Sequence, residues 1–168
     1  MTVARPGDVA ALVALRDSLA RWLLSTGVRQ WLPGEFSVDR MRDWVDRSWV
    51  HVHRIEDDIA AAVAVLPSDT AIWPEDGDAG YIHLLMVARD HAGRGLGDEA
   101  LTDAERLIAG SGRSLSRLDV VSANPALHQW YVTRGYVPVG IKTFDGPDMF
   151  DTTLFQKRLS GGVTRTDP

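Results

Sequence analysis

The chain has 168 residues, of which 45% are hydrophobic and 24% charged, and its formal net charge is −5 at pH 7. This size and composition are typical of one globular domain with its own hydrophobic core. The lack of cysteine excludes disulfides, thiolate catalysis and cysteine-ligated metal sites. An acidic chain is poorly suited to nucleic acid or anionic lipid, and no run is apolar enough to span a bilayer, so we expect a cytoplasmic protein.

Two helices are expected first. Apolar residues recur at helical spacing over 9–23, Asp8 can cap this helix, and Gly27 ends it. A second helix is expected over residues 38–49, with Ser37 as its N-cap.

The middle of the chain has the patterns of strands. Residues 51–55 alternate and residues 59–66 form an apolar run, so together they predict a hairpin. An acidic loop over 67–80 then leads to an apolar strand over 81–88, which only His83 interrupts.

The rest of the chain alternates helices and strands. A glycine-rich turn at 92–97 leads into a helix that Gly110 closes, and Asn124 and Pro125 open another helix that Gly135 ends. Further strands are expected over residues 117–122, 136–144 and 152–159. This order indicates a single α/β (α+β) domain over residues 1–160 with a mixed sheet, followed by a flexible tail over 161–168.

The glycine-rich turn is typical of an anion-binding site. Backbone N–H groups converge where a strand passes through such a turn into a helix, and the helix N-terminus adds partial positive charge. Glycines at 93, 95 and 97 would let the backbone approach a pyrophosphate closely, and Arg94 could add a charged contact. The Walker spacing is not met, and Asp98 stands where the last Rossmann glycine would be. The alternative is a tight turn without a ligand.

Residues 92–97, Ala-Gly-Arg-Gly-Leu-Gly, resemble the pyrophosphate loop R/Q-x-x-G-x-G/A of the GNAT N-acyltransferases. Further along, residues 118–124 resemble the family's L-x-V-x-x-x-N and residues 131–136 its Y-x-x-x-G-F, with Tyr136 in place of Phe. The resemblance spans roughly residues 5–159, and the N-terminal segment is similar to bacterial, especially actinobacterial, members. It implies the GNAT fold, a mixed and mostly antiparallel central sheet of about six to seven strands with about four helices.

The resemblance also implies an activity, that of an acetyl-CoA-dependent N-acetyltransferase. Acetyl-CoA would be the co-substrate, without a metal, and the acetyl group would pass by direct attack in a ternary complex to a primary amine, first of all that of a small molecule. The alternatives are a protein or peptide amine, and a non-catalytic module that senses acyl-CoA. No nucleic acid or membrane partner is implied, and the protein would be a monomer or a homodimer.

Coenzyme A would be held mainly by backbone groups. By the resemblance, it contacts the apolar strand, the glycine-rich turn and the two later motifs, at Leu85, Met86 and Val87, at Ala92, Gly93, Arg94, Gly95, Leu96, Gly97 and Asp98, and at Asn124 and Tyr131. Ala92 replaces the family's Arg or Gln, so it offers only its amide. Asp98 and Glu99 would repel a phosphate, so their side chains are expected to point outward. Asn124 could instead serve only to cap its helix.

Three groups are candidates for the chemistry. The backbone N–H of Leu85 would stabilise the carbonyl oxygen, and the Tyr131 phenol, protonated at neutral pH, would donate to the leaving sulfur. His83 would act as the base, and period-two alternation places Tyr81, His83 and Leu85 on one strand face. Asp119 is an alternative base or could orient His83, and ordered water is a third option. Tyr131 and His83 could also be ordinary core residues.

The acceptor is expected beneath the N-terminal helices, which the resemblance places over the active site. Gln30, Trp31 and Glu35 lie between those helices, and Trp73 lies in the later acidic loop. A tryptophan can cover an apolar group or stack on a cation. Asp119, on the neighbouring strand, completes the expected substrate-binding set.

Overall fold

The computed structural model of the chain describes residues 1–75, 77–146 and 150–160. Its strands are β1 (Thr2–Val3), β2 (Val50–Ile55), β3 (Asp58–Leu66), β4 (Ala79–Val87), β5 (Leu115–Val121), β6 (Val137–Lys142) and β7 (Thr152–Arg158). Its helices are α1 (Val9–Ser25), α2 (Val38–Asp46), α3 (Leu96–Gly110) and α4 (Pro125–Val132), with short 3-10 helices η1 (Pro6–Asp8) and η2 (Arg89–His91). The predicted tail over 161–168 lies outside the described residues.

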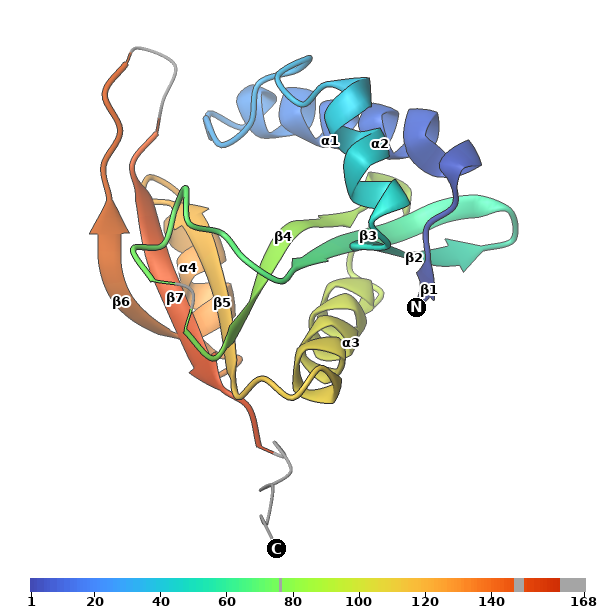
Figure 1. The fold of residues 1–168 in the computed structure, drawn as a ribbon. Helices are drawn as coiled ribbons and strands as arrows, with labels where there is room; N and C mark the ends of the chain where they lie inside the picture. The colour runs from blue at the N-terminus through green and yellow to red at the C-terminus, as the bar shows by residue number, and fades with distance from the viewer. Residues whose placement is uncertain (76, 147–149, 161–168) are drawn as a thin grey trace, which may run out of the picture.

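The strands form one seven-stranded sheet in the order β1-β2-β3-β4-β5-β7-β6 (Figure 1). Neighbouring strands are antiparallel except β4 and β5, which are parallel. The predicted mixed and mostly antiparallel sheet is therefore confirmed. Among the described helices, none combines the length and the apolar character that a membrane span needs.

Every helix and longer strand that the sequence predicts is found, with shifts at the ends. The second helix ends at Asp46 rather than at residue 49, because Ser48 takes a positive φ of 60° and the chain then enters β2. The strand β1 was not expected, because two residues are too few to show any period.

The caps expected from the sequence are found at two helices and not at the third. The Ser37 hydroxyl accepts from the Arg40 amide at 3.1 Å at the start of α2, and Asn124 Oδ1 accepts from the Leu127 amide at 3.1 Å at the start of α4. Asp8 makes no such bond to α1. Its carboxylate instead accepts from the Arg5 amide at 2.7 Å and pairs with Arg54 at 2.6 Å, so Asp8 occupies the predicted N-cap position without the capping bond of its side chain.

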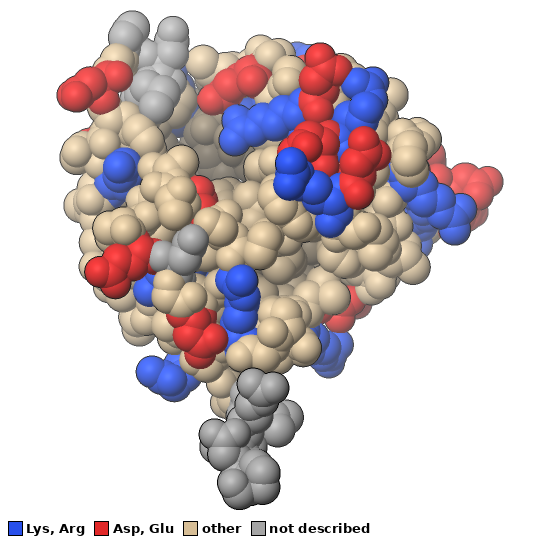
Figure 2. Space-filling model, viewed as in Figure 1, with Lys and Arg blue, Asp and Glu red and all other residues tan. Residues whose placement is uncertain are grey.

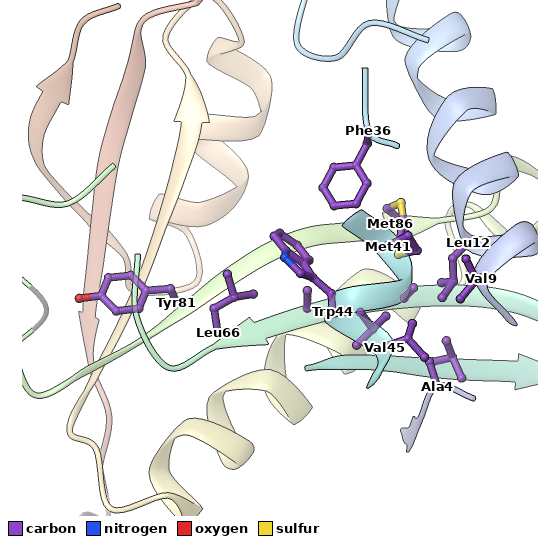
Figure 3. Packing of buried hydrophobic residues seen from close by; sticks show 14 of the residues in the cluster. Ala4, Val9, Leu12, Phe36, Met41, Trp44, Val45, Leu66, Tyr81 and Met86 are labelled. Atoms are coloured by element: carbon purple, nitrogen blue, oxygen red, sulfur yellow. The ribbon is translucent and has the colours of Figure 1, made fainter. Parts of the chain in front are cut away.

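The helices cover the two faces of the sheet (Figure 1). α1 and α2 pack on one face, where Leu12, Met41 and Trp44 join a buried apolar cluster that includes Ala62 of β3 (Figure 3). α3 and α4 pack on the other face, in a second cluster that includes Val63. Successive residues of β3 thus enter opposite cores, as alternation in a strand requires.

A β-bulge interrupts β4 at its centre. Ala62 of β3 faces Met86 and Ala64 faces His83, so the two β4 residues between them oppose one residue of β3. Leu84 takes a positive φ of 48° there. An extra residue reverses the alternation of faces, and Leu85 packs with the α3 and α4 core while Tyr81 and Met86 pack with the other. The prediction that Tyr81, His83 and Leu85 share one face was therefore wrong.

The sheet opens just before this bulge. β4 and β5 are paired only where residues 79–81 meet residues 115–117. Beyond that point the two strands diverge (Figure 1). The backbone of β4 from His83 onward consequently has no partner strand on the β5 side, and the bulge lies at the mouth of the opening.

Candidate active site

Two cavities meet at the β4 bulge. The loop cavity lies between α1, the glycine-rich turn and α4, and its lining includes Trp22, residues 91–93, residues 95–98 and Trp130. The inner cavity lies between the α1–α2 segment and strands β4, β5 and β7. Figure 2 shows the surface hollowed between these parts, with side chains of both charges around the hollow. Both cavities share Gln30, Trp31, Leu85 and Leu127 in their walls, so a ligand could pass from one into the other.

Most residues of the glycine-rich turn line the loop cavity, and several of their backbone amides have no partner among the described residues. The amide of Ala92 donates to the Arg89 carbonyl at 3.1 Å, and that of Asp98 donates to the Gly95 carbonyl at 2.9 Å. The N–H groups of residues 93–97, between them, meet no acceptor within the described part of the chain. Gly95 adopts a φ of 82°, which favours glycine, and this conformation brings the amides to the start of α3.

The acidic residues at the start of α3 are each beside a basic side chain. The Arg134 guanidinium donates to the Asp98 carboxylate, and this bond lowers the pKa of Asp98. The same guanidinium lies 3.7 Å from the centroid of the Trp130 ring. Glu99 is mostly exposed, 3.7 Å from His53 Nδ1. The expected repulsion of an anion by Asp98 is thus reduced by Arg134.

Arg89 is a basic residue of the loop cavity that sequence reasoning missed. It lines the cavity, and its guanidinium lies 3.9 Å from the centroid of the Trp22 ring. Arg94, which was expected to contact the ligand, is exposed and lies with Nη1 3.4 Å from His91 Nδ1. The signal for Arg89 was weak, because the family pattern directs attention to position 92.

Gln30 and Trp31 lie at the junction of the cavities, where they were expected. Asn124 Nδ2 donates to Gln30 Oε1 at 2.9 Å, so Asn124 both caps α4 and holds the α1–α2 loop. The guanidinium of Arg16 lies 5.4 Å from the centroid of the Trp31 ring. These contacts fix the loop over the bulge.

Arg16 is a buried residue whose role the sequence did not indicate. It is 2% exposed on α1, and it donates to the Leu32 carbonyl at 2.7 Å and to Glu35 Oε2 at 2.7 Å. A buried arginine needs such partners, because an unpaired buried charge is strongly destabilising. Arg16 therefore ties the α1–α2 loop to α1 above the inner cavity.

Tyr131 lines the inner cavity from α4. The side chain is 5% exposed, and its hydroxyl makes no hydrogen bond within the described residues and is not among the fully enclosed polar atoms. It therefore faces the cavity. Burial and, to a lesser degree, the charge of Asp119 raise the pKa of Tyr131, so the phenol keeps its proton at neutral pH.

His83 lies between two carboxylates on the opposite wall. Its Nε2 is 3.0 Å from Asp69 Oδ2, and its Nδ1 is 3.9 Å from Asp119 Oδ1. Burial raises the pKa of Asp119, while the neighbouring His83 acts in the opposite direction. The three side chains place one ligand atom each within 4.8 Å of one another, a spacing that could also hold a metal ion. The hydrogen bond to Asp69 already occupies Nε2.

Asp69 was missed because it comes from the acidic loop before β4, where no motif distinguishes one carboxylate from the next. Only the fold brings it to His83. Trp73, from the same loop, was expected beside the acceptor, but it is 4% exposed and lines neither cavity. Its ring centroid lies 6.1 Å from that of Tyr81, and the Arg117 guanidinium lies 4.6 Å from it. The structure therefore places Trp73 in the core.

The strand residues expected along the ligand differ in exposure. Leu85 and Val87 line the loop cavity, whereas the Met86 side chain is 1% exposed and packs beneath α1 and α2 (Figure 3). Met86 therefore lines neither cavity.

Comparison with known proteins shows the family to which the chain is similar. Residues 16–136 match the Acetyltransferase (GNAT) family. The uncharacterized N-acetyltransferase YesJ of Bacillus subtilis (strain 168) is 32% identical over 162 residues, which cover 91% of this chain and 86% of YesJ.

Solved structures show the same fold. A GNAT family acetyltransferase from Listeria monocytogenes 4b F2365 is 28% identical, with a TM-score of 0.76 over 94% of this chain and 92% of its own. The PaiA N-acetyltransferase of Thermoplasma acidophilum, solved in complex with coenzyme A, is 13% identical, with a TM-score of 0.72 over 94% of this chain and 96% of its own.

Proposed function

Because the chain belongs to the GNAT acetyltransferase family and is therefore an acetyl-CoA-dependent N-acyltransferase, we propose that it acetylates the primary amine of a small molecule. The observation that carries the proposal is the meeting of the two cavities at Leu85. Acetyl-CoA bound in the loop cavity would place its thioester at this junction. An amine bound in the inner cavity could then reach the thioester from the other side. Direct attack in a ternary complex needs such an arrangement.

The loop cavity fits a diphosphate. Acetyl-CoA supplies the thioester and the acetyl group that is transferred. The N–H groups of residues 93–97 have no acceptor within the described chain, which suits phosphate oxygens at the start of α3. Arg89 adds a charge in the same cavity, which offsets the loss of the family's Arg or Gln at Ala92. Leu85, Val87 and Asn124, which line the same cavity, would complete the contacts.

The bulge in β4 supplies an N–H group that we expect to bind the carbonyl oxygen of the thioester. A bulge leaves a residue outside the ladder of hydrogen bonds, and Leu85 lies in this bulge at the wall of both cavities. We assign to the Leu85 N–H the stabilisation of negative charge on the oxygen during attack.

We assign to His83 the removal of a proton from the acceptor amine. An ionised Asp69 can only accept, so the neutral imidazole donates from Nε2 and keeps the lone pair on Nδ1. At 3.9 Å, Asp119 does not occupy Nδ1 with a direct hydrogen bond. Nδ1 can then take the amine proton through a water molecule, and the nearby Asp119 carboxylate stabilises the imidazolium that results.

We assign to Tyr131 the protonation of the leaving thiolate. A thiolate whose thiol has a pKa of ~8.5 needs a proton on leaving. The phenol, whose pKa is raised by burial, carries a proton at neutral pH and faces the inner cavity. Donation from its hydroxyl to the sulfur would complete the reaction, and solvent would restore the proton.

The size of the inner cavity supports a small acceptor. Its volume is about 290 Å³, at the lower end of the range for small-molecule sites. Arg16 and Asn124 hold the α1–α2 loop over it, which restricts the approach of a protein surface.

Thiol release from acetyl-CoA, measured against a library of small amines and against peptides with a free N-terminus or lysine, tests the proposal. We expect release with small amines and a rise in melting temperature with acetyl-CoA alone. Release with peptides only would redirect the proposal to a protein acceptor. A thermal shift without release for any amine would identify an acyl-CoA sensor.

A further inference from the structure

The inner cavity has opposite charges at its two ends. At its floor, His83 lies between the carboxylates of Asp69 and Asp119. At its rim lies Arg40 of α2, an exposed side chain that also lines the cavity. A cationic amine is attracted to the floor, and the rim is suited to an anion.

Arg40 differs from the other arginine in the cavity wall. Arg16 is buried and paired with Glu35 at 2.7 Å. No carboxylate lies within ion-pair distance of Arg40 in the part of the chain that the structure describes. Its guanidinium instead lies 4.8 Å from the centroid of the Phe36 ring and 5.4 Å from that of Trp44. Stacking on rings fixes a guanidinium while leaving its edge N–H groups available.

The neighbouring arginines of α2 show that this is a property of Arg40 rather than of the helix. Arg42 pairs with Asp39 at 2.6 Å, and Arg47 pairs with Asp43 at 2.9 Å. Asp43 is also at helical spacing from Arg40, but its carboxylate accepts from Arg47. Asp39 and Asp43 are therefore engaged by arginines outside the cavity wall.

Trp44 lies in the cavity wall beside the charged groups of both ends. Its ring centroid lies 5.9 Å from that of His83 and 5.4 Å from the Arg40 guanidinium carbon. Figure 3 shows Phe36 and Trp44 close together, with Phe36 on the side away from the sheet. Trp44 thus offers an apolar surface beside both His83 and Arg40.

We propose that the acceptor is an amino carboxylate: its amine lies at His83, an apolar spacer packs along Trp44, and its carboxylate is bound by Arg40. The inference rests on the proposed function and names the substrate class of that site. The guanidinium of Arg40 presents a planar fork of donors, which matches a carboxylate in a bidentate contact. Arg40 acts here as a specificity residue and takes no part in the proton transfers.

The test compares acceptors that differ only at the far end. Thiol release is measured with amino carboxylates of graded chain length, with their neutral methyl esters and with diamines of equal length. For the wild type, we expect kcat/KM for the best amino carboxylate to exceed that of its ester by roughly tenfold to a hundredfold, as for a hydrogen-bonded charge pair. The diamine should be the poorest of the three.

Arg40→Gln should bring the ratio between carboxylate and ester close to one. Arg42→Gln is the matched control, because Arg42 is on the same helix, half-exposed and paired with Asp39 outside the cavity wall. The ratio should survive in this control. Arg40→Glu should reverse the preference and favour the diamine.

A ratio near one in the wild type, or a high ratio that survives Arg40→Gln, would overturn the assignment of Arg40 while leaving the acetyltransferase activity intact. Absence of thiol release with every amine would instead overturn the proposed function. Calorimetric titration of the amino carboxylate into the wild type and Arg40→Gln, both with coenzyme A present, then decides about Arg40 alone. Equal affinity for the two proteins, or no binding to either, would reject the inference.

Discussion

The loop cavity and the inner cavity meet at Leu85, yet they are built from different parts of the polypeptide. The loop cavity offers backbone N–H groups from one continuous stretch, residues 93–97. The inner cavity offers side chains from separate segments, with Tyr131 on α4, His83 on β4 and Arg40 on α2. The first depends on the path of the backbone, and the second on the identity of each side chain. Substitutions should therefore act differently on the two cavities.

The largest effect is expected from a side chain of the inner cavity. Tyr131→Phe removes one oxygen and leaves the ring packing in place, so kcat should fall by about a hundredfold to ten-thousandfold, the contribution of a general acid. The affinity for coenzyme A should stay within about threefold, because we propose that the loop cavity binds it through backbone N–H groups. Steady-state kinetics and calorimetry check the two halves of the prediction.

Tyr136→Phe is the control for loss of a buried phenol. The Tyr136 hydroxyl is 2.6 Å from the Ser116 hydroxyl and lines neither cavity, so its removal should lower stability and leave kcat largely unchanged. Equal losses of kcat in the two variants would show that Tyr131 acts only through packing.

The next effect is expected from the backbone of the loop cavity. Gly95→Val places a β-branched residue at a φ of 82°, where strain costs about 1–3 kcal/mol and is relieved by moving the amides. Coenzyme A affinity should fall by roughly tenfold to a hundredfold, measured by calorimetry. Gly112→Val is the matched control, because Gly112 has a φ of 83° and equally open surroundings but lies at the far end of α3. A similar loss of affinity in both variants would contradict a local role for Gly95.

The same contrast explains what the sequence could predict. A turn rich in glycine is a local signal, since the residues that form the loop cavity are adjacent in the chain. The helices, the longer strands and the resemblance at residues 92–97 were all readable for this reason. Trp73 was misplaced, because an aromatic residue in a loop can equally enter the core, where it packs on Tyr81.

The inner cavity was predicted only in part. Asp69 and Arg40 gave no signal, because each becomes part of the site only when distant segments fold together. The bulge at Leu84 also lacked a signal, and it reversed the face on which Leu85 lies. Alternation is a rule for regular strands, so a single extra residue was enough to make the prediction wrong.

A smaller effect on the rate is expected from Asp69, which we expect to act by positioning His83. Asp69→Asn keeps the shape of the side chain but removes the charge beside His83 Nε2. We expect kcat/KM to fall by about tenfold, since the orientation of His83 is less well fixed. The pH profile of the rate should also change, because the charge beside the imidazole is lost.

Asp78→Asn, in the same loop, is the control for Asp69. Asp78 accepts from the Ser114 amide at 3.2 Å, at the opposite end of β4 from the bulge. Its substitution should leave the pH profile unchanged. If Asp69→Asn lowers the rate equally at every pH, Asp69 has only a structural role.

The smallest effects are expected on stability, when one carboxylate of each cavity is replaced: Asp119 in the inner cavity and Asp98 in the loop cavity. Burial raises the pKa of Asp119, so its ionised form is disfavoured in the folded protein at neutral pH. Asp119→Asn should therefore raise the free energy of unfolding by about 1 kcal/mol while lowering the rate. The hydrogen bond from Arg134 lowers the pKa of Asp98, so its ionised form is favoured and Asp98→Asn should slightly lower stability.

The pH dependence of the two variants should also be opposite in sign. As the pH falls from neutral through the raised pKa of Asp119, the folded wild type takes up the proton before the unfolded chain does, so the advantage of Asp119→Asn should shrink. The contribution of Asp98 is present above its unfolded pKa of 3.8 and is lost only as the pH falls through the lower folded value. Denaturant unfolding between about pH 7 and pH 4 measures the first change, and its extension to about pH 2 measures the second. A loss of stability in Asp119→Asn at neutral pH would mean that pairing with His83 outweighs burial, so that the inner cavity stabilises the fold as well as the reaction.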